Sequence, residues 1–306
     1  MASFFSKKRN VVFTAIFYTF LWGCAFPLVK ICMDSFGIID GDNFSKCLIA
    51  GIRFTLSGII ALSWCAFKDE ERLSIKPKAI KTLLLYGILS TSLQYAFTYV
   101  ALSRMDSSKG AVFDQLCVFV IVLCGGLIFR EDRLTVKKTV GCIMGFIGVL
   151  IINTDGISLS FDIMGEGVML LAVLAQTLAY FVAKGTASDI SAPKLVGYGQ
   201  TVGGVILSGF SLIMGGRIHT VNAPAILSLI ALILISSLAY MLSLAPLKYF
   251  PASEISSFNL LITVFGVIMS AIVLGEDVLR WNYFVSLSLL SAGIVMINLR
   301  KKESKR

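Results

Sequence analysis

The chain has 306 residues, of which 57% are hydrophobic and 15% charged, and its mean hydropathy is +0.86. Soluble globular domains carry about 25% charged residues, so too little polar surface is available here to cover a water-soluble core. The apolar residues form runs of about twenty, which is the length of a transmembrane helix and far longer than the alternating strands of a membrane barrel. The composition therefore predicts an all-α integral membrane protein.

The formal net charge of +9 could indicate a nucleic-acid partner, but the basic residues stand in short clusters between the apolar runs. That arrangement is typical of membrane topology, so no nucleic-acid partner is expected. The seven cysteines form no Cys-x-x-Cys pair, and the one histidine, His219, falls in a predicted loop. We therefore expect no metal site, no cofactor and no Cys–His catalytic pair.

Ten apolar segments predict ten transmembrane helices joined by short connections, with no soluble domain attached. In chain order they are Val11–Met33, Lys46–Phe67, Ala79–Ser103, Ser107–Phe129, Thr135–Asn153, Ile163–Lys184, Lys194–Met214, Pro224–Lys248, Ala252–Leu274 and Arg280–Leu299.

The basic residues also indicate the direction of the helices. The N-terminus, every second connection and the C-terminal tail together hold 20 of the 27 lysines and arginines. By the positive-inside rule, both termini are predicted to lie in the cytoplasm and the chain to cross the cell membrane several times. An even number of helices requires both ends on one side, so the two arguments agree.

An internal repeat appears when the chain is compared with itself at a shift of 145 residues. Without a gap, Glu131 and Leu134 then lie over Glu276 and Leu279, and 12 of the 52 positions between 102 and 153 are identical. The first helix matches the sixth at a shift of 154, which places Ala25 over Ala179. The domains predicted are a cytoplasmic segment (1–10), a five-helix repeat (11–153), a second five-helix repeat (154–299) and a basic cytoplasmic tail (300–306).

An odd number of helices per repeat means that the second repeat must run inverted through the membrane. Inverted repeats are a recurring device of secondary transporters, in which one half rocks against the other around a central site. We therefore predict a transporter that works by alternating access around a central cavity. Within the fifth helix, Gly141, Gly145 and Gly148 share one face and predict a ridge for close helix packing.

Several short motifs resemble the EamA repeat of the drug/metabolite transporter superfamily. Leu21 to Pro27 resembles its opening Trp-Gly signature, Arg53-Phe54 its Arg-Phe, and Glu131 with Leu134-Thr135, Gly141 and Gly148-Val149 its closing pattern. The resemblance covers essentially the whole chain, once per half. It implies ten helices around a central cavity and outward movement of small organic metabolites, often amino acids. A proline frequent in the family's fourth and ninth helices has no equivalent near Cys117 or Ile262, and the sixth helix lacks the Trp-Gly pair.

Two ionisable residues inside predicted helices are functional candidates, because charge is costly in a membrane. Arg53 and Asp114 each lie seven positions, roughly 10 Å, from the outer end of their helices. Equal depth allows a structural ion pair, substrate or proton contact by one member, or no contact at all. A buried carboxyl also binds a proton more readily, so Asp114 is a candidate for proton coupling.

Amides and aromatic rings at similar depths complete the predicted site, although for each single aromatic residue helix or lipid packing is the favoured interpretation. The second half carries neutral residues where the first carries charge, since Asn259 overlies Asp114 and Gln200 lies at the mirrored depth of Arg53. Such walls suit an amphipathic solute with a few hydrogen-bonding groups. The predicted substrate-binding residues are Trp22, Arg53, Gln94, Tyr95, Tyr99, Asp114, Gln115, Gln176, Tyr180, Gln200, Tyr240 and Asn259.

Together these features predict a secondary active transporter that exports a small organic metabolite, an amino acid or related compound. The expected partners are that solute and the lipid bilayer, with a monomer favoured over a dimer. Uptake or exchange of a sugar- or nucleotide-type metabolite is the alternative among transporters. A membrane enzyme or a scaffold is disfavoured, and no Gly-x-x-x-x-Gly-Lys-Ser/Thr loop for ATP is present.

Overall fold

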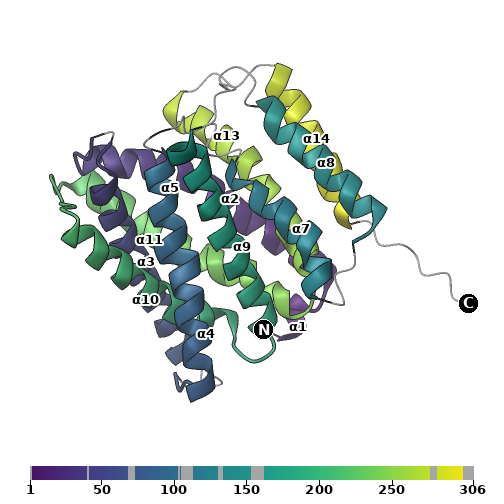
Figure 1. Cartoon of the computed structure of the whole chain (residues 1–306), viewed down its shortest axis with the longest axis horizontal. Helices are drawn as coiled ribbons and strands as arrows, with labels where there is room; N and C mark the ends of the chain where they lie inside the picture. The colour runs from purple at the N-terminus through teal and green to yellow at the C-terminus, as the bar shows by residue number, and fades with distance from the viewer. Residues whose placement is uncertain are drawn as a thin grey trace, which may run out of the picture.

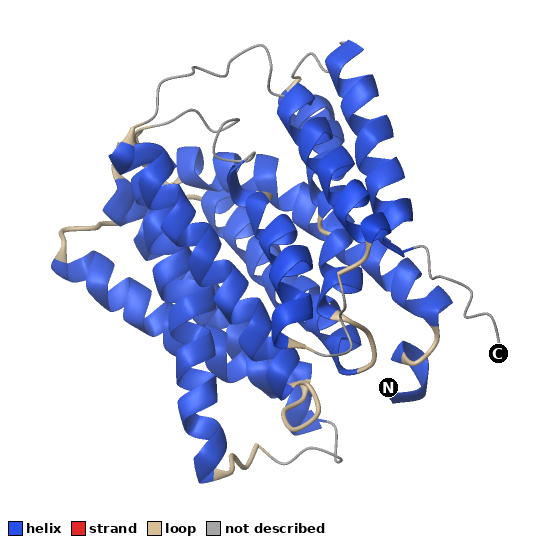
Figure 2. Cartoon of the chain, turned by 45° about the vertical axis from the view of Figure 1, so that its right-hand side comes forward, coloured by secondary structure: helices blue, strands red, loops and turns tan. Residues whose placement is uncertain are grey.

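The computed structural model describes residues 2–39, 41–67, 73–102, 104, 113–129, 134–152, 162–275 and 281–298. Throughout these ranges every regular element is a helix, as predicted (Figure 2). The loop motifs around Glu131 and Glu276 and the basic tail at 300–306 lie outside the described residues.

The helices follow the predicted segments, and several segments are divided into two or three successive pieces. In the first half they are α1 (Ala2–Phe5), α2 (Lys8–Ser35), α3 (Asn43–Phe67), α4 (Pro77–Gly87), the π-helix η1 (Ile88–Leu93), α5 (Gln94–Leu102), α7 (Leu116–Ile128) and α8 (Val136–Ile152). In the second half they are the π-helix η2 (Ile163–Gly167), α9 (Val168–Thr186), α10 (Ala192–Ile213), α11 (Ala223–Leu244), the 3-10 helix η3 (Ala245–Lys248), α12 (Ala252–Ser257), α13 (Leu260–Leu274) and α14 (Trp281–Asn298).

Two helices begin three residues earlier than predicted, because polar residues before the apolar run also take helical conformation. At the start of α3, the carboxylate of Asp42 accepts a hydrogen bond of 3.0 Å from the backbone N–H of Ser45. This N-terminal cap satisfies a donor that the first helical turn would otherwise leave unpaired. At the start of α2, the backbone N–H groups of Asn10 and Val11 both bond to the carbonyl of Lys7.

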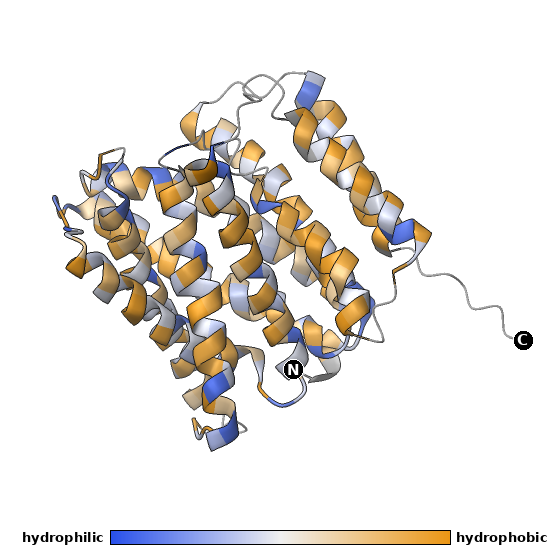
Figure 3. Ribbon diagram, viewed as in Figure 1, coloured by the Kyte–Doolittle hydropathy of each residue, from blue (hydrophilic) through white to orange (hydrophobic). Residues whose placement is uncertain are grey.

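Six helical segments among the described residues are long and apolar enough to cross a membrane. They are Lys8–Ser35, Asn43–Phe67, Ile163–Thr186, Ala192–Ile213, Ala223–Lys248 and Ala252–Leu274. Apolar residues dominate the helices along most of their length, and polar residues gather toward several helix ends (Figure 3). The chain is therefore a multi-pass membrane protein.

The other four predicted crossings differ in length or polarity. α7, α8 and α14 have 13, 17 and 18 residues, respectively. The succession of α4, η1 and α5 is long enough, but its middle carries the buried polar side chains of Ser90, Thr91, Ser92 and Gln94, which lower its hydropathy. These residues face the protein rather than lipid.

Helix packing follows the internal repeat. α3 packs along α10, and α8 packs along α14 at one edge of the molecule (Figure 1). α2 lies against α11 and α13, while its counterpart α9 lies against α5 and α7. The two halves therefore exchange equivalent contacts, as expected for a repeat related by an approximate two-fold axis.

The contact between α8 and α14 reproduces this symmetry in detail. A methyl group added at Gly141 would lie 2.7 Å from the carbonyl oxygen of Gly293, and one added at Gly293 equally close to that of Gly141. At the other end of the contact, the hydroxyl of Ser286 donates to the carbonyl of Gly148 at 2.6 Å. At the repeat shift of 145 residues, Gly141 corresponds to Ser286 and Gly148 corresponds to Gly293. The contact of Gly141 with Gly293 and the contact of Ser286 with Gly148 are therefore related by the symmetry of the repeat. The predicted packing role of the glycine ridge is confirmed.

Two helices are interrupted within two residues of equivalent positions, which the sequence does not indicate. The helical hydrogen bonding is broken at Gln115 before α7 and at Phe258 and Asn259 between α12 and α13. There the N–H groups of Val118, Leu261 and Ile262 bond to carbonyls three residues earlier. Discontinuous helices near the middle of the membrane are a frequent feature of transporter binding sites.

Candidate functional site

Five aromatic side chains from four helices form one cluster around the middle of α3. The ring of Trp22 (α2) meets that of Tyr240 (α11) edge to face at 5.0 Å. Phe54 (α3) lies 4.5 Å from Tyr95 (α5), and Tyr95 lies 6.5 Å from Tyr99, measured between ring centroids. We call these five residues the aromatic cluster. Four of them, all except Phe54, are predicted site residues.

Arg53 points its guanidinium into this cluster. Its Nε donates a 2.7 Å hydrogen bond to the hydroxyl of Ser236 on α11. The guanidinium carbon lies 5.0 Å from the ring centre of Phe54 and 5.9 Å from that of Trp22, within the range of cation–π attraction. Only 5% of Arg53 is exposed, and its Nη2 has no hydrogen-bond partner among the described residues.

A direct contact joins the two halves inside the cluster. The hydroxyl oxygens of Tyr95 and Tyr240 lie 3.4 Å apart, and either can donate the hydrogen bond. The two tyrosines are 145 residues apart, which is the repeat shift, so they are equivalent residues of the two halves. The approximate two-fold axis therefore passes close to this pair.

The position of Trp22 depends on the small residue that follows it. A methyl group added at Gly23 would lie 2.9 Å from the backbone nitrogen of Gly266 on α13. Glycine at this position allows α2 and α13 to approach closely, with Trp22 directed toward α11. The Trp-Gly motif thus has a structural reason in this chain.

Asp114 does not pair with Arg53 in this structure. Both residues are described, and no ion pair joins them; the carboxylate of Asp114 bonds to no described residue. α3 begins at Asn43, which places Arg53 ten residues, roughly 15 Å, from that end rather than 10 Å. Asp114 remains half-buried just before the interruption at Gln115.

The predicted amide residues lie on several helices, and three hold buried atoms without a described hydrogen-bond partner. These atoms are Oε1 of Gln115, Oε1 of Gln176 and Nε2 of Gln200. Gln200 lies at the contact of α3 with α10, where its Oε1 accepts a hydrogen bond of 2.7 Å from the Ser57 hydroxyl. Gln94 is buried at the start of α5.

Two further predicted residues occupy the second half. Asn259 accepts a 3.1 Å hydrogen bond from the hydroxyl of Tyr18, one helical turn before Trp22. Tyr180 on α9 packs against the apolar residues between α7 and α9 and also against those near η3. The structure thus gathers Trp22, Arg53, Tyr95, Tyr99 and Tyr240 in one cluster and distributes the remaining predicted residues around it.

Sequence reasoning missed several partners of the site. Phe54 directly follows Arg53 in the Arg-Phe motif, which is a signal that could have identified it. Ser236, Ser57 and Tyr18 carry no such signal, because single hydroxyl residues are common in apolar helices. Glu254 is likewise not among the predicted residues; it is only 8% exposed and pairs with Lys8 at 2.7 Å.

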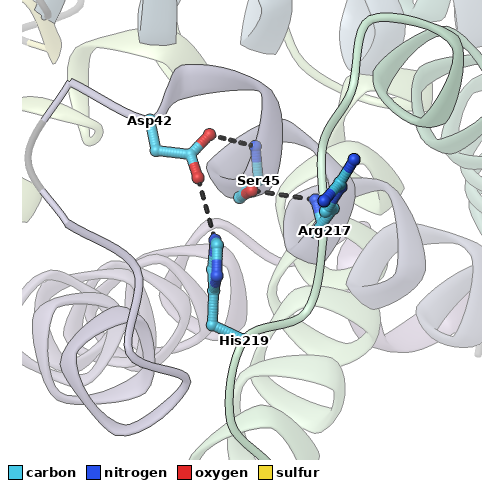
Figure 4. Close-up of polar contacts among 4 residues, drawn as sticks. All are labelled: Asp42, Ser45, Arg217 and His219. Atoms are coloured by element: carbon cyan, nitrogen blue, oxygen red, sulfur yellow. Dashed lines mark hydrogen bonds and ion pairs between the residues drawn. The ribbon is translucent and has the colours of Figure 1, made fainter.

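Polar contacts also join the halves at the two ends of the helices. The loop between α2 and α3 meets the segment between α10 and α11, where Asp42 lies 3.1 Å from His219 and the N–H of Arg217 donates to the Ser45 hydroxyl (Figure 4). Partial burial alone would raise the pKa of Asp42, but hydrogen bonds from Ser45 and the neighbouring His219 outweigh it and lower the pKa. We call the four residues Asp42, Ser45, Arg217 and His219 the loop contact. Lys8 and Glu254 form the corresponding link at the opposite end.

Comparison with known proteins gives consistent results. The sequence profile described as "EamA-like transporter family" matches residues 9–154 and 163–299. An uncharacterised transporter of Bacillus subtilis (strain 168), YvbV, is 26% identical over 98% of this chain and 94% of its own length. A "probable amino-acid metabolite efflux pump" of Salmonella typhimurium is 25% identical over 95% of this chain and 94% of its own length. One solved protein structure superimposes with a TM-score of 0.75, at 15% identity, over 93% of this chain and 98% of its own, which shows a shared fold.

Proposed function

The chain belongs to the EamA-like transporter family, and from that membership we propose that it is a secondary active transporter exporting a small organic metabolite. The solute class is an amino acid or related compound, as in the name of the Salmonella relative. The chain acts by alternating access, as a monomer and without enzymatic chemistry.

The contact between Tyr95 and Tyr240 carries this proposal. Equivalent residues of two inverted halves meet here, beside the buried cation Arg53. At such a position, rocking of one half against the other can open the site toward either side of the membrane in the same way. Trp22, Tyr95, Tyr99 and Tyr240 are all half-buried although they lie deep among the helices. Partial exposure at that depth supports an interior space for solute between the halves.

In this proposal all ten helical segments cross the cell membrane, with both termini in the cytoplasm. The distribution of lysine and arginine supports the orientation. The loop contact then lies on the outer side, and the pair of Lys8 with Glu254 lies on the inner side. Each link joins the two halves at one end of the helices, so in this proposal the loop contact opens in the outward-facing state and the pair of Lys8 with Glu254 opens in the inward-facing state.

A two-stage experiment tests the proposal. Cells with and without the protein are challenged with a panel of amino acids and related metabolites, and protection identifies the exported solute. That solute is then followed in proteoliposomes under an imposed pH gradient. Accumulation driven by the gradient supports secondary transport; the absence of any protein-dependent flux across the panel contradicts it. Tyr240→Ala, which removes the contact with Tyr95, is expected to lower the flux and serves as the reference variant.

A further inference from the structure

The guanidinium of Arg53 is incompletely satisfied where it stands. Nε is engaged by Ser236, whose hydroxyl in turn donates to the carbonyl of Leu232 at 2.8 Å. Nη2 is buried and has no hydrogen-bond partner among the described residues. A buried charge is costly unless it is paired and hydrogen-bonded, and ring faces compensate only part of that cost.

No described carboxylate neutralises this charge. Asp114 forms no ion pair with it, and Gln200 on the neighbouring helix α10 is neutral and bonded to Ser57. Among the described residues the guanidinium therefore has no ion-pair partner. An arginine in this state presents a planar fork of donors that matches the two oxygens of a carboxylate.

The walls around the free edge are aromatic. Trp22 and Phe54 lie on the guanidinium, and Tyr95 and Tyr240 place two hydroxyl groups beside the rings. Such walls suit a flat apolar body next to the anionic group.

We propose that Arg53 binds the carboxylate of the transported solute, and that the aromatic cluster accommodates an adjoining flat or apolar group. This inference rests on the proposed function and narrows its solute class to organic monocarboxylates. An amino group on the solute is not required for binding, because the free donors of Arg53 bond to the carboxylate and not to an amine.

The test uses binding rather than transport, with three probes of similar shape: phenylacetate (acid only), L-phenylalanine (acid and amine) and phenethylamine (amine only). The chain has three tryptophans, so Trp64→Phe with Trp281→Phe leaves Trp22 as a fluorescent reporter inside the cluster. In purified full-length protein we expect phenylacetate and L-phenylalanine to change the Trp22 emission in a saturable manner, and phenethylamine to leave it unchanged.

Variants then assign the effect to the guanidinium. Arg53→Gln should weaken phenylacetate binding about ten- to a hundredfold, the usual worth of hydrogen bonds to a charged group. Arg53→Lys keeps the charge without the fork and should bind at an intermediate level. Arg217→Gln, on the exposed loop, is the matched control and should bind normally.

The proposal is overturned if phenethylamine binds as well as phenylacetate, if Arg53→Gln binds phenylacetate normally, or if none of the three probes binds. The comparison of the three probes needs no substitution at Arg53, so it remains decisive even if Arg53→Gln does not fold. If the protein exports a solute but shows no preference for acids, the role of Arg53 is rejected and the proposed function stands. If the protein binds acids but transports no solute, the proposed function is rejected and the binding role of Arg53 stands.

Discussion

Tyr95 and Tyr240 are equivalent residues of the two halves, and their hydroxyl oxygens lie 3.4 Å apart. This contact of equivalent residues therefore lies close to the approximate two-fold axis that relates the halves. Each ring also has a second aromatic neighbour, Phe54 beside Tyr95 and Trp22 beside Tyr240. The pair therefore couples the junction of the halves to the residues around Arg53.

Substitution of Tyr240 separates the hydroxyl contact from ring packing. Tyr240→Phe should lower the free energy of unfolding by no more than about 1 kcal/mol, the net worth of one hydrogen bond. Tyr240→Ala also removes the edge-to-face partner of Trp22, and we expect a loss of about 1 to 3 kcal/mol for this half-buried ring. Denaturant unfolding in detergent measures both. Equal losses in the two variants would show that the ring contributes nothing.

The contact between α8 and α14 should tolerate no added side chain. Gly141→Ala would place its methyl group against the carbonyl of Gly293, so we expect a loss of about 1 to 3 kcal/mol. Gly209→Ala is the control, because a methyl group there meets no atom within 4 Å and alanine favours the helix. Thermal unfolding should rank Gly141→Ala below the wild type and Gly209→Ala at or above it. The reverse order would refute tight packing at Gly141.

Asp114 is expected to link transport to protons. Its half-buried carboxylate bonds to no described residue, so it is available to gain and lose a proton. Asp114→Asn should transport solute down its own gradient and lose the response to an imposed pH gradient. Proteoliposome flux with and without the gradient measures the change. An unchanged response in the variant would exclude Asp114 from coupling.

The loop contact should lose strength in acid. The pKa of Asp42 is lowered in the folded protein, so its ionised form favours folding above the ordinary value of 3.8, and this contribution is lost as the pH falls below it. The melting temperature of Asp42→Asn should therefore lie below that of the wild type at neutral pH, and the difference should close in acid. Asp34→Asn, on an exposed neighbour, should show no such difference. A gap independent of pH would contradict the contribution of the carboxylate.

The sequence predicts the helices well because run length and hydropathy are local properties. Helix ends are less well predicted, since Asp42 and Lys7 extend α3 and α2 through polar residues that hydropathy assigns to loops. The interruptions at Gln115 and Asn259 carry no proline or glycine that would reveal them.

In the site, too, the sequence predicts individual residues better than it predicts the contacts between them. Residue type identifies Arg53, the tyrosines and Trp22 as candidates, because charged and amphipathic groups are conspicuous in an apolar chain. Their partners follow from packing between helices far apart in sequence. Equal depth in the sequence indicates Asp114 as a partner of Arg53, whereas the structure supplies Ser236 from α11 instead.

The reciprocal contact between Gly141 and Gly293 and between Gly148 and Ser286 has a consequence for the origin of the chain. An interface in which each side presents the same residues is isologous, the kind formed by two identical subunits in a dimer. A separate five-helix ancestor carrying one copy of this glycine face would already have possessed both surfaces that the contact needs. Fusion of two such genes would preserve the interface and free each copy to diverge, as Gly141 and Ser286 have done.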